Sequence, residues 1–414
     1  MGFARVEQPT LVPPELLDGQ AAVTLRETVP LKARRDRGAF FSSSALRAAA
    51  LAACPEEGRA DGPTLDPAVG AGDLLIEAAK ALRVDQDLAE TLRHWSDLLH
   101  GRDIDPAFVR LAKARLVLLA VDRGAVVIGD TPAPTLPDVL PGIQVGDGLE
   151  LLRRNPAAAH IVMNPPFTYG VAPPETQWAS GRTSNAAMFL AAAVEAAQPG
   201  TRLTAILPDV IRTGSRYEQL RSHIESLLRV SSIEPYGRFD RWTDIDVFVL
   251  SGVVTDEPAD APSPLWWHQP LAEQVGDRFD VHVGPVVPHR DAESGPDRPY
   301  LHARTIPLGG EFDAETAERG GFTSRLFSPP FVVVRRTSRP NDGSRGLGTI
   351  IVGSQDVLVE NHLIVLKPQD SSVDTCRQLV RLLDSTRAKQ WLDGRIRCRH
   401  LTVRALREMP WWAS

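Results

Sequence analysis

The stretch HIVMNPPF, residues 160–167, decides how this chain is interpreted. A short apolar run that ends at Met163 is typical of a buried strand, yet Asn164 and two prolines follow it directly. Neither proline donates a backbone hydrogen bond, each fixes its own φ, and the residue before a proline is pushed toward extended geometry. The sequence therefore predicts a strand that ends at Asn164, followed by a stiff turn that presents an amide side chain and backbone carbonyls in fixed directions.

Segments on both sides of this stretch alternate between strand and helix patterns. Strand-turn units are predicted within 63–82, 94–106, 142–152, 159–167, 201–208 and 244–254, and helices within 38–55, 73–82, 106–120, 183–198 and 217–230. Such alternation predicts an α/β fold with a doubly wound, Rossmann-like, mostly parallel sheet.

The length of 414 residues favours two domains. After Val254 the acidic, proline-rich segment 255–264 is typical of a linker. A mixed α+β domain is predicted beyond it, with strand-like pieces at 331–336, 348–353 and 361–368 and helices around 372–391 and 402–408. We therefore divide the chain into an N-terminal arm (1–33), an α/β domain (34–255) and a C-terminal domain (256–414).

Composition describes an ordinary soluble globular protein, with 43% hydrophobic and 24% charged residues. No apolar run approaches the ~20 residues of a membrane helix, and no signal pattern opens the chain, so we expect no membrane partner and a cytoplasmic location. The three scattered cysteines form neither a disulfide framework nor a metal knuckle. His160 has no second ligand at a suitable spacing, so no metal site is predicted.

Charge is unevenly distributed along the chain. The net charge is −6, but the segment from Gly321 to the C-terminus has 15 Lys and Arg against 8 Asp and Glu. Such asymmetry is a hint of a nucleic-acid-binding face in the C-terminal part, although solvated arginines on a helix surface give the same pattern.

Four predicted strand ends carry polar or glycine-rich sequences. They are DPAVGAGD (66–73), GRDIDP with Asp103, GDG with Asp147, and Asn164 with its prolines. In an open α/β sheet, ligands bind outside the carboxyl ends of the strands. The glycine loop is not GxGxxG and lacks the Gly-Lys-Ser/Thr of a phosphate-binding loop, so alone it is equally consistent with a plain tight turn.

The order GAFFS, DPAVGAG, GRDIDP, GDG and NPPF resembles the S-adenosylmethionine-dependent DNA adenine-N6 methyltransferases of the γ arrangement. The resemblance covers residues 34–255 closely. It extends more loosely to 275–290, 299–307, 361–368 and 401–412, which resemble that family's C-terminal target-recognition domain. The resemblance implies that double-stranded DNA is the partner and S-adenosylmethionine the cofactor.

By this resemblance, the stiff turn is the catalytic motif, Asn164-Pro165-Pro166-Phe167. The Asn164 side-chain carbonyl and the Pro165 backbone carbonyl would each accept one hydrogen of an adenine amino group, which exposes the nitrogen lone pair. Fixed acceptors aimed at developing charge are an efficient form of catalysis. Phe167 would offer its ring to the base, which must be flipped out of the duplex at a cost of about a few kcal/mol.

The resemblance also implies a set of cofactor-binding residues. Those at the methionine end are Gly38, Phe41 and Ser42, those of the loop are Asp66, Ala68, Gly70 and Gly72, and those at the ribose and adenine are Asp103, Ile104, Asp147 and Gly148, with Asn164 beside them. Ser42-Ser43 stands where the family usually has Thr-Pro, Val69 where it often has Cys, and His160 where it has an acidic residue.

Substrate contacts are expected from the C-terminal domain. Phe279 occupies the family position of an aromatic that packs against the flipped base. Arginines are the candidates for contacts with the DNA backbone, which supply affinity without sequence information, namely Arg335, Arg336, Arg395, Arg397 and Arg399.

Two other functions remain open. The Asn-Pro-Pro-aromatic motif also serves methyltransferases that act on RNA base amines or a protein glutamine amide, but those usually carry the extra domain ahead of the catalytic one. A DNA-binding subunit with a decayed pocket is the non-enzymatic alternative, which the intact motifs oppose. No nuclease signature stands out, so a restriction or defence subunit, if there is one, is expected as a separate chain.

Overall fold

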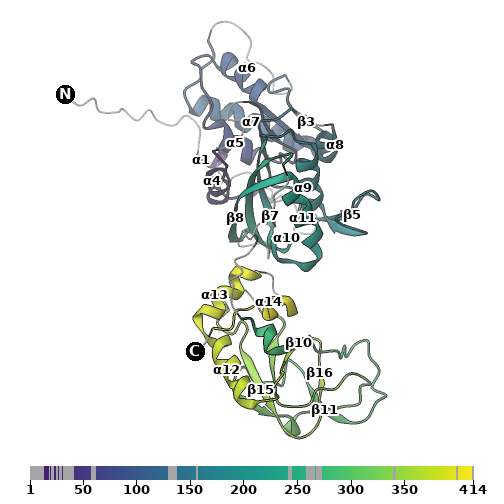
Figure 1. Cartoon of the computed structure of the whole chain (residues 1–414). Helices are drawn as coiled ribbons and strands as arrows, with labels where there is room; N and C mark the ends of the chain where they lie inside the picture. Colours follow the sequence, from purple (N-terminus) through teal and green to yellow (C-terminus); the bar gives the residue numbers. More distant parts are fainter. Residues whose placement is uncertain are drawn as a thin grey trace, which may run out of the picture. The chain divides into compact units, whose positions relative to one another are not determined.

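The computed structural model describes residues 42–56, 62–128, 138–154, 157–240, 245–257, 266, 273–338, 342–397 and 400–412, together with 14–17 and a few positions between 19 and 30. The chain divides into two compact units, Met1–Trp266 and Trp267–Ser414. Figure 1 shows both units, coloured along the sequence.

The first unit is built on a seven-stranded sheet with the order β3-β2-β1-β4-β7-β9-β8. Its strands are β1 (Thr64–Asp66), β2 (Leu99–Asp103), β3 (Ile143–Val145), β4 (His160–Met163), β7 (Arg202–Pro208), β8 (Leu228–Arg238) and β9 (Asp246–Val254). Neighbours from β3 to β7 pair in parallel, whereas β9 pairs antiparallel with both β7 and β8. This is the predicted mostly parallel sheet, with β9 reversed.

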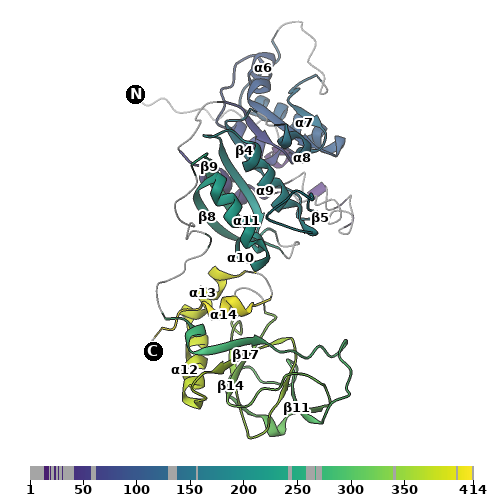
Figure 2. The same cartoon turned by 45° about the vertical axis from the view of Figure 1, so that its right-hand side comes forward.

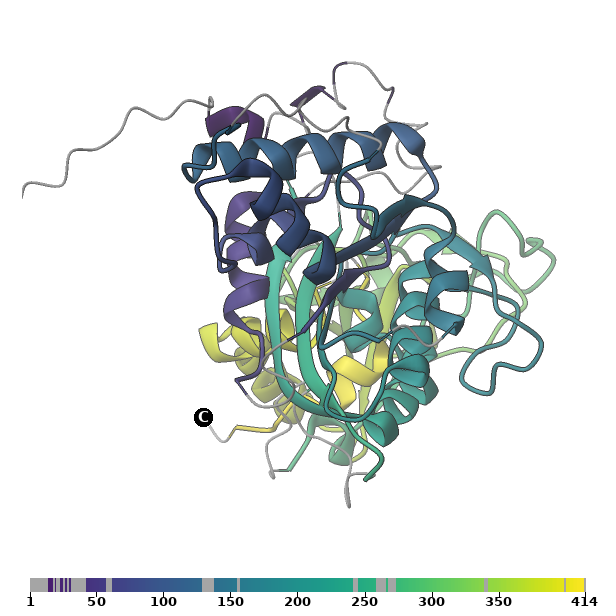
Figure 3. The same ribbon diagram turned by 90° about the horizontal axis from the view of Figure 1, so that it is seen from above.

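Helices cover the sheet in two groups, which Figure 3 shows on opposite sides of the strands. One group comprises α1 (Pro14–Leu17), α4 (Ser44–Ala52), α5 (Asp73–Ala79), α6 (Leu88–Leu98) and α7 (Pro106–Asp122). The other comprises α8 (Gly148–Arg153), α9 (Asn185–Ala196), α10 (Asp209–Thr213), the 3₁₀ turn η1 (Ser215–Tyr217) and α11 (Glu218–Leu227). A short hairpin of β5 (Tyr169–Val171) and β6 (Arg182–Ser184) precedes α9.

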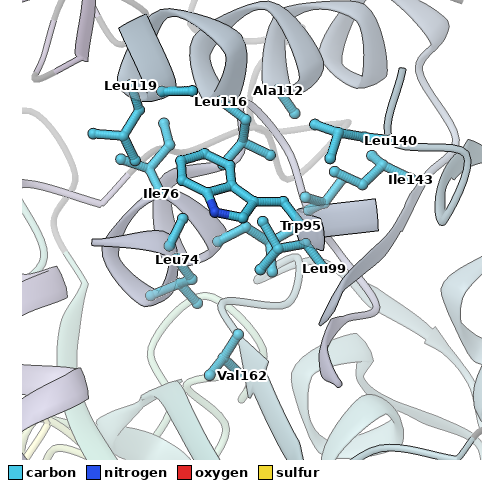
Figure 4. Close-up of a cluster of buried hydrophobic side chains, with 14 of the residues drawn as sticks. Leu74, Ile76, Trp95, Leu99, Ala112, Leu116, Leu119, Leu140, Ile143 and Val162 are labelled. Carbon is cyan, nitrogen blue, oxygen red and sulfur yellow. The ribbon is translucent and has the colours of Figure 1, made fainter. Parts of the chain in front are cut away.

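The core of this unit surrounds Trp95, which is fully buried (Figure 4). Apolar side chains of α5, α7 and the adjacent strands enclose its ring, among them Ile76, Leu116 and Ile143. The indole N–H donates to the Arg83 carbonyl at 2.9 Å, so its polar atom is satisfied. Because loss of such a ring costs about 3–5 kcal/mol, Trp95 is a main anchor of the unit.

The second unit contains a five-stranded sheet and a smaller three-stranded sheet (Figure 2). The larger has the order β10-β17-β14-β15-β12 and the smaller β13-β11-β16. The strands are β10 (Phe279–Val283), β11 (Arg298–Leu301), β12 (Glu311–Asp313), β13 (Arg319–Gly320), β14 (Phe331–Arg335), β15 (Gly348–Val352), β16 (Leu358–Val359) and β17 (Leu363–Pro368). Helices α12 (Val373–Asp384), α13 (Thr386–Arg395) and α14 (Val403–Arg407), with the 3₁₀ turns η3 (Val275–Asp277) and η4 (Ala314–Thr316), complete this α+β unit.

Two local expectations are wrong. The helix predicted for 217–230 ends at Leu227, and residues 228–238 form strand β8, which the sequence pattern did not reveal. β8 lies at the sheet edge with a half-exposed face, so its charged residues break the apolar alternation of a buried strand. Helix α6 was also missed, because residues 94–98 were taken as the approach to β2. The predicted fold class is confirmed.

Candidate functional site

The four polar strand ends lie around one pocket. Strands β1, β2 and β4 are neighbours in the sheet, and β3 follows β2, so their carboxyl ends meet along one edge. A pocket of about 570 Å³ opens there, within the range of small-molecule sites. Among the predicted residues, those that line it are Ser42, Asp66, Ala68, Gly70, Asp103, Ile104, Asp147, Gly148, Asn164 and Pro166.

The glycine loop after β1 forms one wall. Gly70 has φ +50° and Gly72 φ +84°, the left-handed region that glycine adopts without strain. Gly72 is the N-cap of α5, and the Asp66 carboxylate accepts a hydrogen bond from the Ala68 N–H at 3.0 Å. The loop therefore turns sharply enough to bring its backbone to the pocket, although Gly72 itself does not line it.

Asp103, at the end of β2, is held in place by two backbone N–H groups. One carboxylate oxygen accepts from Gly70 N at 3.0 Å and the other from Asp105 N at 2.9 Å. These bonds couple the ends of β1 and β2. Ile104 follows with 71% of its surface exposed, so it presents an apolar face beside the carboxylate.

The turn after β3 packs closely on the glycine loop. Asp147 caps α8, and its carboxylate accepts from Leu149 N at 2.8 Å. A Cβ at Gly148 would stand 1.8 Å from the Pro67 carbonyl oxygen, which is far inside a van der Waals contact. Only glycine permits this approach, so Gly148 sets the width of the pocket at this point.

Asn164 projects into the same pocket from the end of β4. Its amide nitrogen donates to the Ser42 hydroxyl at 3.0 Å, which fixes the direction of the amide. Pro165 is buried and Phe167 half-buried, and neither lines the pocket. The Phe167 ring packs edge-to-face on Phe239, with ring centroids 5.5 Å apart and an interplanar angle of 83°.

Phe239 is a site neighbour that the sequence analysis did not identify. It follows β8 and is 2% exposed, and it belongs to the core of the first unit. A single aromatic after an unrecognised edge strand gives no sequence signal, because only the sheet order brings it beside Phe167.

The pocket is rich in carboxylates. Asp66, Asp73, Asp103, Asp105 and Asp147 line it, and none of its described lining residues is Lys or Arg. Burial, with smaller contributions from the nearby Asp103 and Asp73, raises the pKa of Asp66 to about 8 against the lowering effect of the hydrogen bond from Ala68. Burial likewise raises the pKa of Asp103. This electrostatic environment suits a ligand with positive charge and hydroxyl or amino hydrogens, and it opposes a phosphate.

Arg115 of α7 supports the pocket wall from behind. It is 2% exposed, and its guanidinium donates to Asp73 at 2.8 Å and to the Ala71 carbonyl at 2.6 Å. Further bonds reach the carbonyls of Leu16 and Leu17 in α1 at 3.1 and 2.8 Å. One buried arginine thus ties the glycine loop, α5 and α1 together, a role that the sequence did not suggest.

Phe279 was predicted to contact the flipped base, and this prediction is wrong. The side chain is 1% exposed and packs in the core of the second unit, with its ring centroid 5.9 Å from that of Trp411. Strand β10 alternates in burial, and Phe279 falls on its inner face. A ring enclosed in this way cannot stack on a base.

Arg395 is also unsuited to its predicted contact with DNA. It is 2% exposed and forms an ion pair with Glu408 at 2.9 Å, so its charge is already neutralised inside the unit. Arg335, Arg336 and Arg397 are half-buried, and their contact with DNA stays a prediction. Gly38, Phe41 and Arg399 lie outside the described residues.

His160 is a buried residue of strand β4 with a hydrogen-bonding partner in the neighbouring strand β7. It is 4% exposed, and its Nε2 lies 3.0 Å from the Thr204 hydroxyl. Burial, with a contribution from Arg202, lowers its pKa to about 3, so the ring stays neutral. Within the described part of the chain, no group of three or more His, Cys, Asp and Glu residues could hold a metal ion.

None of the helices in the described residues combines the length and the apolar character that crossing a bilayer requires.

No protein-family model matches the sequence, and no curated protein matches it. Among solved structures, the chain is similar to the type IIL restriction-modification enzyme MmeI in complex with DNA, with a TM-score of 0.56, 13% identity, and coverage of 93% of this chain and 70% of that one. It is also similar to the type IIG restriction endonuclease BpuSI (TM-score 0.45, 15% identity, 95% and 60% coverage). A third match is a protein of Listeria monocytogenes assigned to the class I S-adenosylmethionine-dependent methyltransferases (TM-score 0.38, 14% identity, 60% and 71% coverage).

These similarities concern the fold. The first unit has a doubly wound, mostly parallel α/β fold, and the likeness to MmeI extends over 93% of this chain. The chain spans 60% of the length of BpuSI and 70% of that of MmeI.

Proposed function

We propose that this protein is an S-adenosylmethionine-dependent DNA methyltransferase that modifies the N6 amine of a flipped adenine. The observation that carries the proposal is the position of Asn164. Its amide, fixed by Ser42, shares one pocket with the carboxylates of Asp66, Asp103 and Asp147. A hydrogen-bond acceptor for the target amine and a carboxylate-lined cofactor site would thereby be adjacent.

The pocket residues fit the proposed cofactor. S-Adenosylmethionine carries a sulfonium and an ammonium charge, ribose hydroxyls and an adenine amino group, and it has no phosphate. Asp103 would accept from the ribose hydroxyls, Asp147 from the adenine amino group, and Ile104 would pack on the adenine. When bound, the cofactor supplies an electrophilic methyl group. The absence of Lys and Arg among the described lining residues argues against a dinucleotide.

The chain's own contribution to catalysis would be polarisation of the target amine. The Ser42 hydroxyl accepts from the Asn164 nitrogen and so orients the amide, whose side-chain carbonyl would accept one adenine amino hydrogen. The Pro165 carbonyl would accept the second hydrogen, since the two prolines hold the turn rigid. Acceptors fixed before reaction need no reorganisation as charge develops, which is the main source of their catalytic effect.

DNA is the favoured substrate because of the second unit. A mixed-sheet unit follows the first unit in the chain, and the likeness to MmeI, a restriction-modification enzyme described in complex with DNA, extends over 93% of this chain. The γ order of motifs supports adenine-N6 chemistry, in restriction-modification or another phage-defence system. A separate restriction or defence subunit is the expected partner.

The test is transfer of labelled methyl from S-adenosylmethionine to unmethylated bacterial DNA, with RNA and protein offered in parallel. We expect the label to appear in DNA as N6-methyladenine. Sequencing would then map the positions of the methylated adenines. N164A should lose at least a hundred-fold in rate, the usual effect of removing a group that stabilises developing charge, while cofactor affinity changes little. The matched control is Q144A, which removes an exposed amide outside the pocket lining. Label in RNA or protein instead of DNA would overturn the substrate assignment.

A further inference from the structure

The β5–β6 hairpin lies in the sequence between the turn at Asn164 and Asn185, and both of these residues line the pocket. β5 begins at Tyr169, five residues after Asn164, and β6 ends at Ser184, directly before the pocket-lining Asn185. The base of the hairpin is closed by Asn185, whose amide nitrogen donates to the Thr168 hydroxyl at 2.6 Å and whose backbone N–H donates to the Thr168 carbonyl at 2.9 Å. Anything that moves the hairpin therefore moves the edge of the site.

The inner face of this hairpin is packed against the unit. Thr183 is 1% exposed, and a Cβ at its partner Gly170 would stand 2.5 Å from the Asn185 side-chain oxygen. Trp178 in the connecting loop is also buried, at 7%. These contacts hold the hairpin in a defined position, which a two-stranded ribbon does not maintain alone.

The outer face carries a different set of side chains. Tyr169 and Val171 alternate with Gly170 and are 53% and 73% exposed, and Arg182 pairs directly with Val171. The exposed Arg216 donates to the Arg182 carbonyl, so a second guanidinium borders this face. The one acidic residue of the hairpin is Glu175, in the loop. Figure 1 shows β5 projecting from the helices beside it.

Single exposed apolar residues are common on protein surfaces. Here the exposed residues are grouped on one hairpin, and their types match the chemistry of nucleic acids. An aromatic ring, a branched aliphatic side chain and a guanidinium group lie on a hairpin whose base holds the pocket-lining Asn185, and a second arginine, Arg216, bonds to that hairpin. Aromatic rings stack on bases of any sequence, and guanidinium groups pair with phosphates. A base that reacts in a pocket must first leave the helical stack, which opens a gap beside it.

We propose that the outer face of the β5–β6 hairpin contacts duplex DNA next to the target adenine. Tyr169 stacks against the bases at the gap, Val171 packs beside it, and Arg182 and Arg216 hold the adjacent phosphates. The hairpin thereby stabilises the opened duplex, and because it is tied to Thr168 and Asn185, it does so at a fixed distance from Asn164. This inference rests on the proposed function and adds the element that contacts the opened duplex.

The experiment compares two DNA substrates that contain the methylation site located by sequencing the methylated DNA. One is a fully paired duplex, and the other has an abasic position opposite the target adenine, so that the base is already unpaired. We expect Y169A to lose on the order of ten-fold in kcat/KM on the paired duplex, in line with the energy of one stacked base. On the abasic duplex the loss should fall to less than two-fold. Y169F, which keeps the ring, should resemble the wild type.

R182A provides a second variant. We expect it to raise the KM for DNA on both duplexes and to leave the KM for S-adenosylmethionine unchanged on both. V127A, which truncates an exposed valine outside the pocket lining, is the matched control and should leave both rates unchanged. Equal losses of Y169A on both duplexes, or no loss on either, would overturn the role of the hairpin. If the wild type methylates neither DNA although it binds S-adenosylmethionine, the proposed function fails, and this inference fails with it.

Discussion

The Asn164 amide nitrogen lies 3.0 Å from the Ser42 hydroxyl, although 122 residues separate the two in sequence. Ser42 precedes α4, whose N-cap is Ser43, and its own carbonyl accepts from the buried Arg47 at 2.9 Å. The hydroxyl is therefore positioned by a helix start and a buried arginine. It orients the amide that we propose as the acceptor of the adenine amino group.

S42A tests this relationship. Removal of the hydroxyl takes away one hydrogen bond that orients the Asn164 amide, and the loss of one neutral hydrogen bond of about 0.5–1.5 kcal/mol predicts a fall in kcat of about two- to ten-fold. Cofactor affinity should change less than kcat. Steady-state kinetics with calorimetry of S-adenosylmethionine binding measures both, and S44A, on the exposed side of α4, is the control. A kcat equal to that of the wild type would show that Ser42 does not position the amide.

Cofactor binding should depend on pH through Asp66. Burial raises the pKa of its carboxyl to about 8, whereas a cationic ligand favours the ionised form. Binding below pH 8 must therefore release a proton, so affinity should rise from pH 6 to pH 8 and level off above. Calorimetry across this range measures the slope, and in D66N the slope should be smaller than in the wild type. An identical slope in both proteins would assign the proton to another group.

The same carboxyl affects the stability of the ligand-free protein. Its pKa is about 3.9 in an unfolded chain and about 8 when folded, so folding takes up a proton between these values. Stability therefore falls as pH rises through this window. D66N should melt at a higher temperature than the wild type at pH 8, and the difference should shrink toward pH 4. Thermal unfolding at both pH values decides this, and a lower melting temperature for D66N at pH 8 would contradict it.

G148A should disrupt the pocket. The added methyl would lie 1.8 Å from the Pro67 carbonyl oxygen, a backbone atom that cannot move without displacing the glycine loop. We expect a destabilisation of about 3 kcal/mol or more and loss of cofactor binding, as for other overpacked sites. G394A is the matched control, because no atom lies within 4 Å of the new methyl and helix propensity predicts a gain of about 0.5–1 kcal/mol. Denaturant unfolding of both variants gives the comparison.

Arg115 should be important for the stability of the first unit and for cofactor binding, because it holds Asp73 and the Ala71 carbonyl of the glycine loop. R115M keeps the aliphatic stem but removes the ion pair of Asp73 at 2.8 Å and the bond to the Ala71 carbonyl, so that Arg47, at 3.5 Å, is the cation that Asp73 keeps among the described residues. Breaking one side of a buried ion pair costs about 3–5 kcal/mol. We expect a loss of this size in unfolding free energy and weaker cofactor binding. R110M, an exposed arginine on the same helix, should change neither, and equal stability of the two variants would refute the role of Arg115.

The sequence located the strand ends because their residues have few local alternatives. Two consecutive prolines end a strand wherever they occur, and Gly70 and Gly72 mark a turn that other residues form only with strain. The same reasoning gave the alternation of strands and helices, and hence the fold class. It failed at β8, where an edge strand lacks a continuous apolar pattern, and at Phe279, where position in a motif says nothing about which face of a strand is buried.

What the sequence determined by itself is therefore local: the stiff turn at Asn164, the glycine loop, the capped helices and the mostly parallel sheet that their order implies. The tertiary structure alone decided which distant groups meet, among them Ser42 with Asn164, Phe239 with Phe167, and Arg115 with Asp73. The physical reason is that backbone preferences act over a few residues. Burial, hydrogen-bond partners and raised pKa values depend instead on neighbours that only the packing of the sheet and its helices brings together.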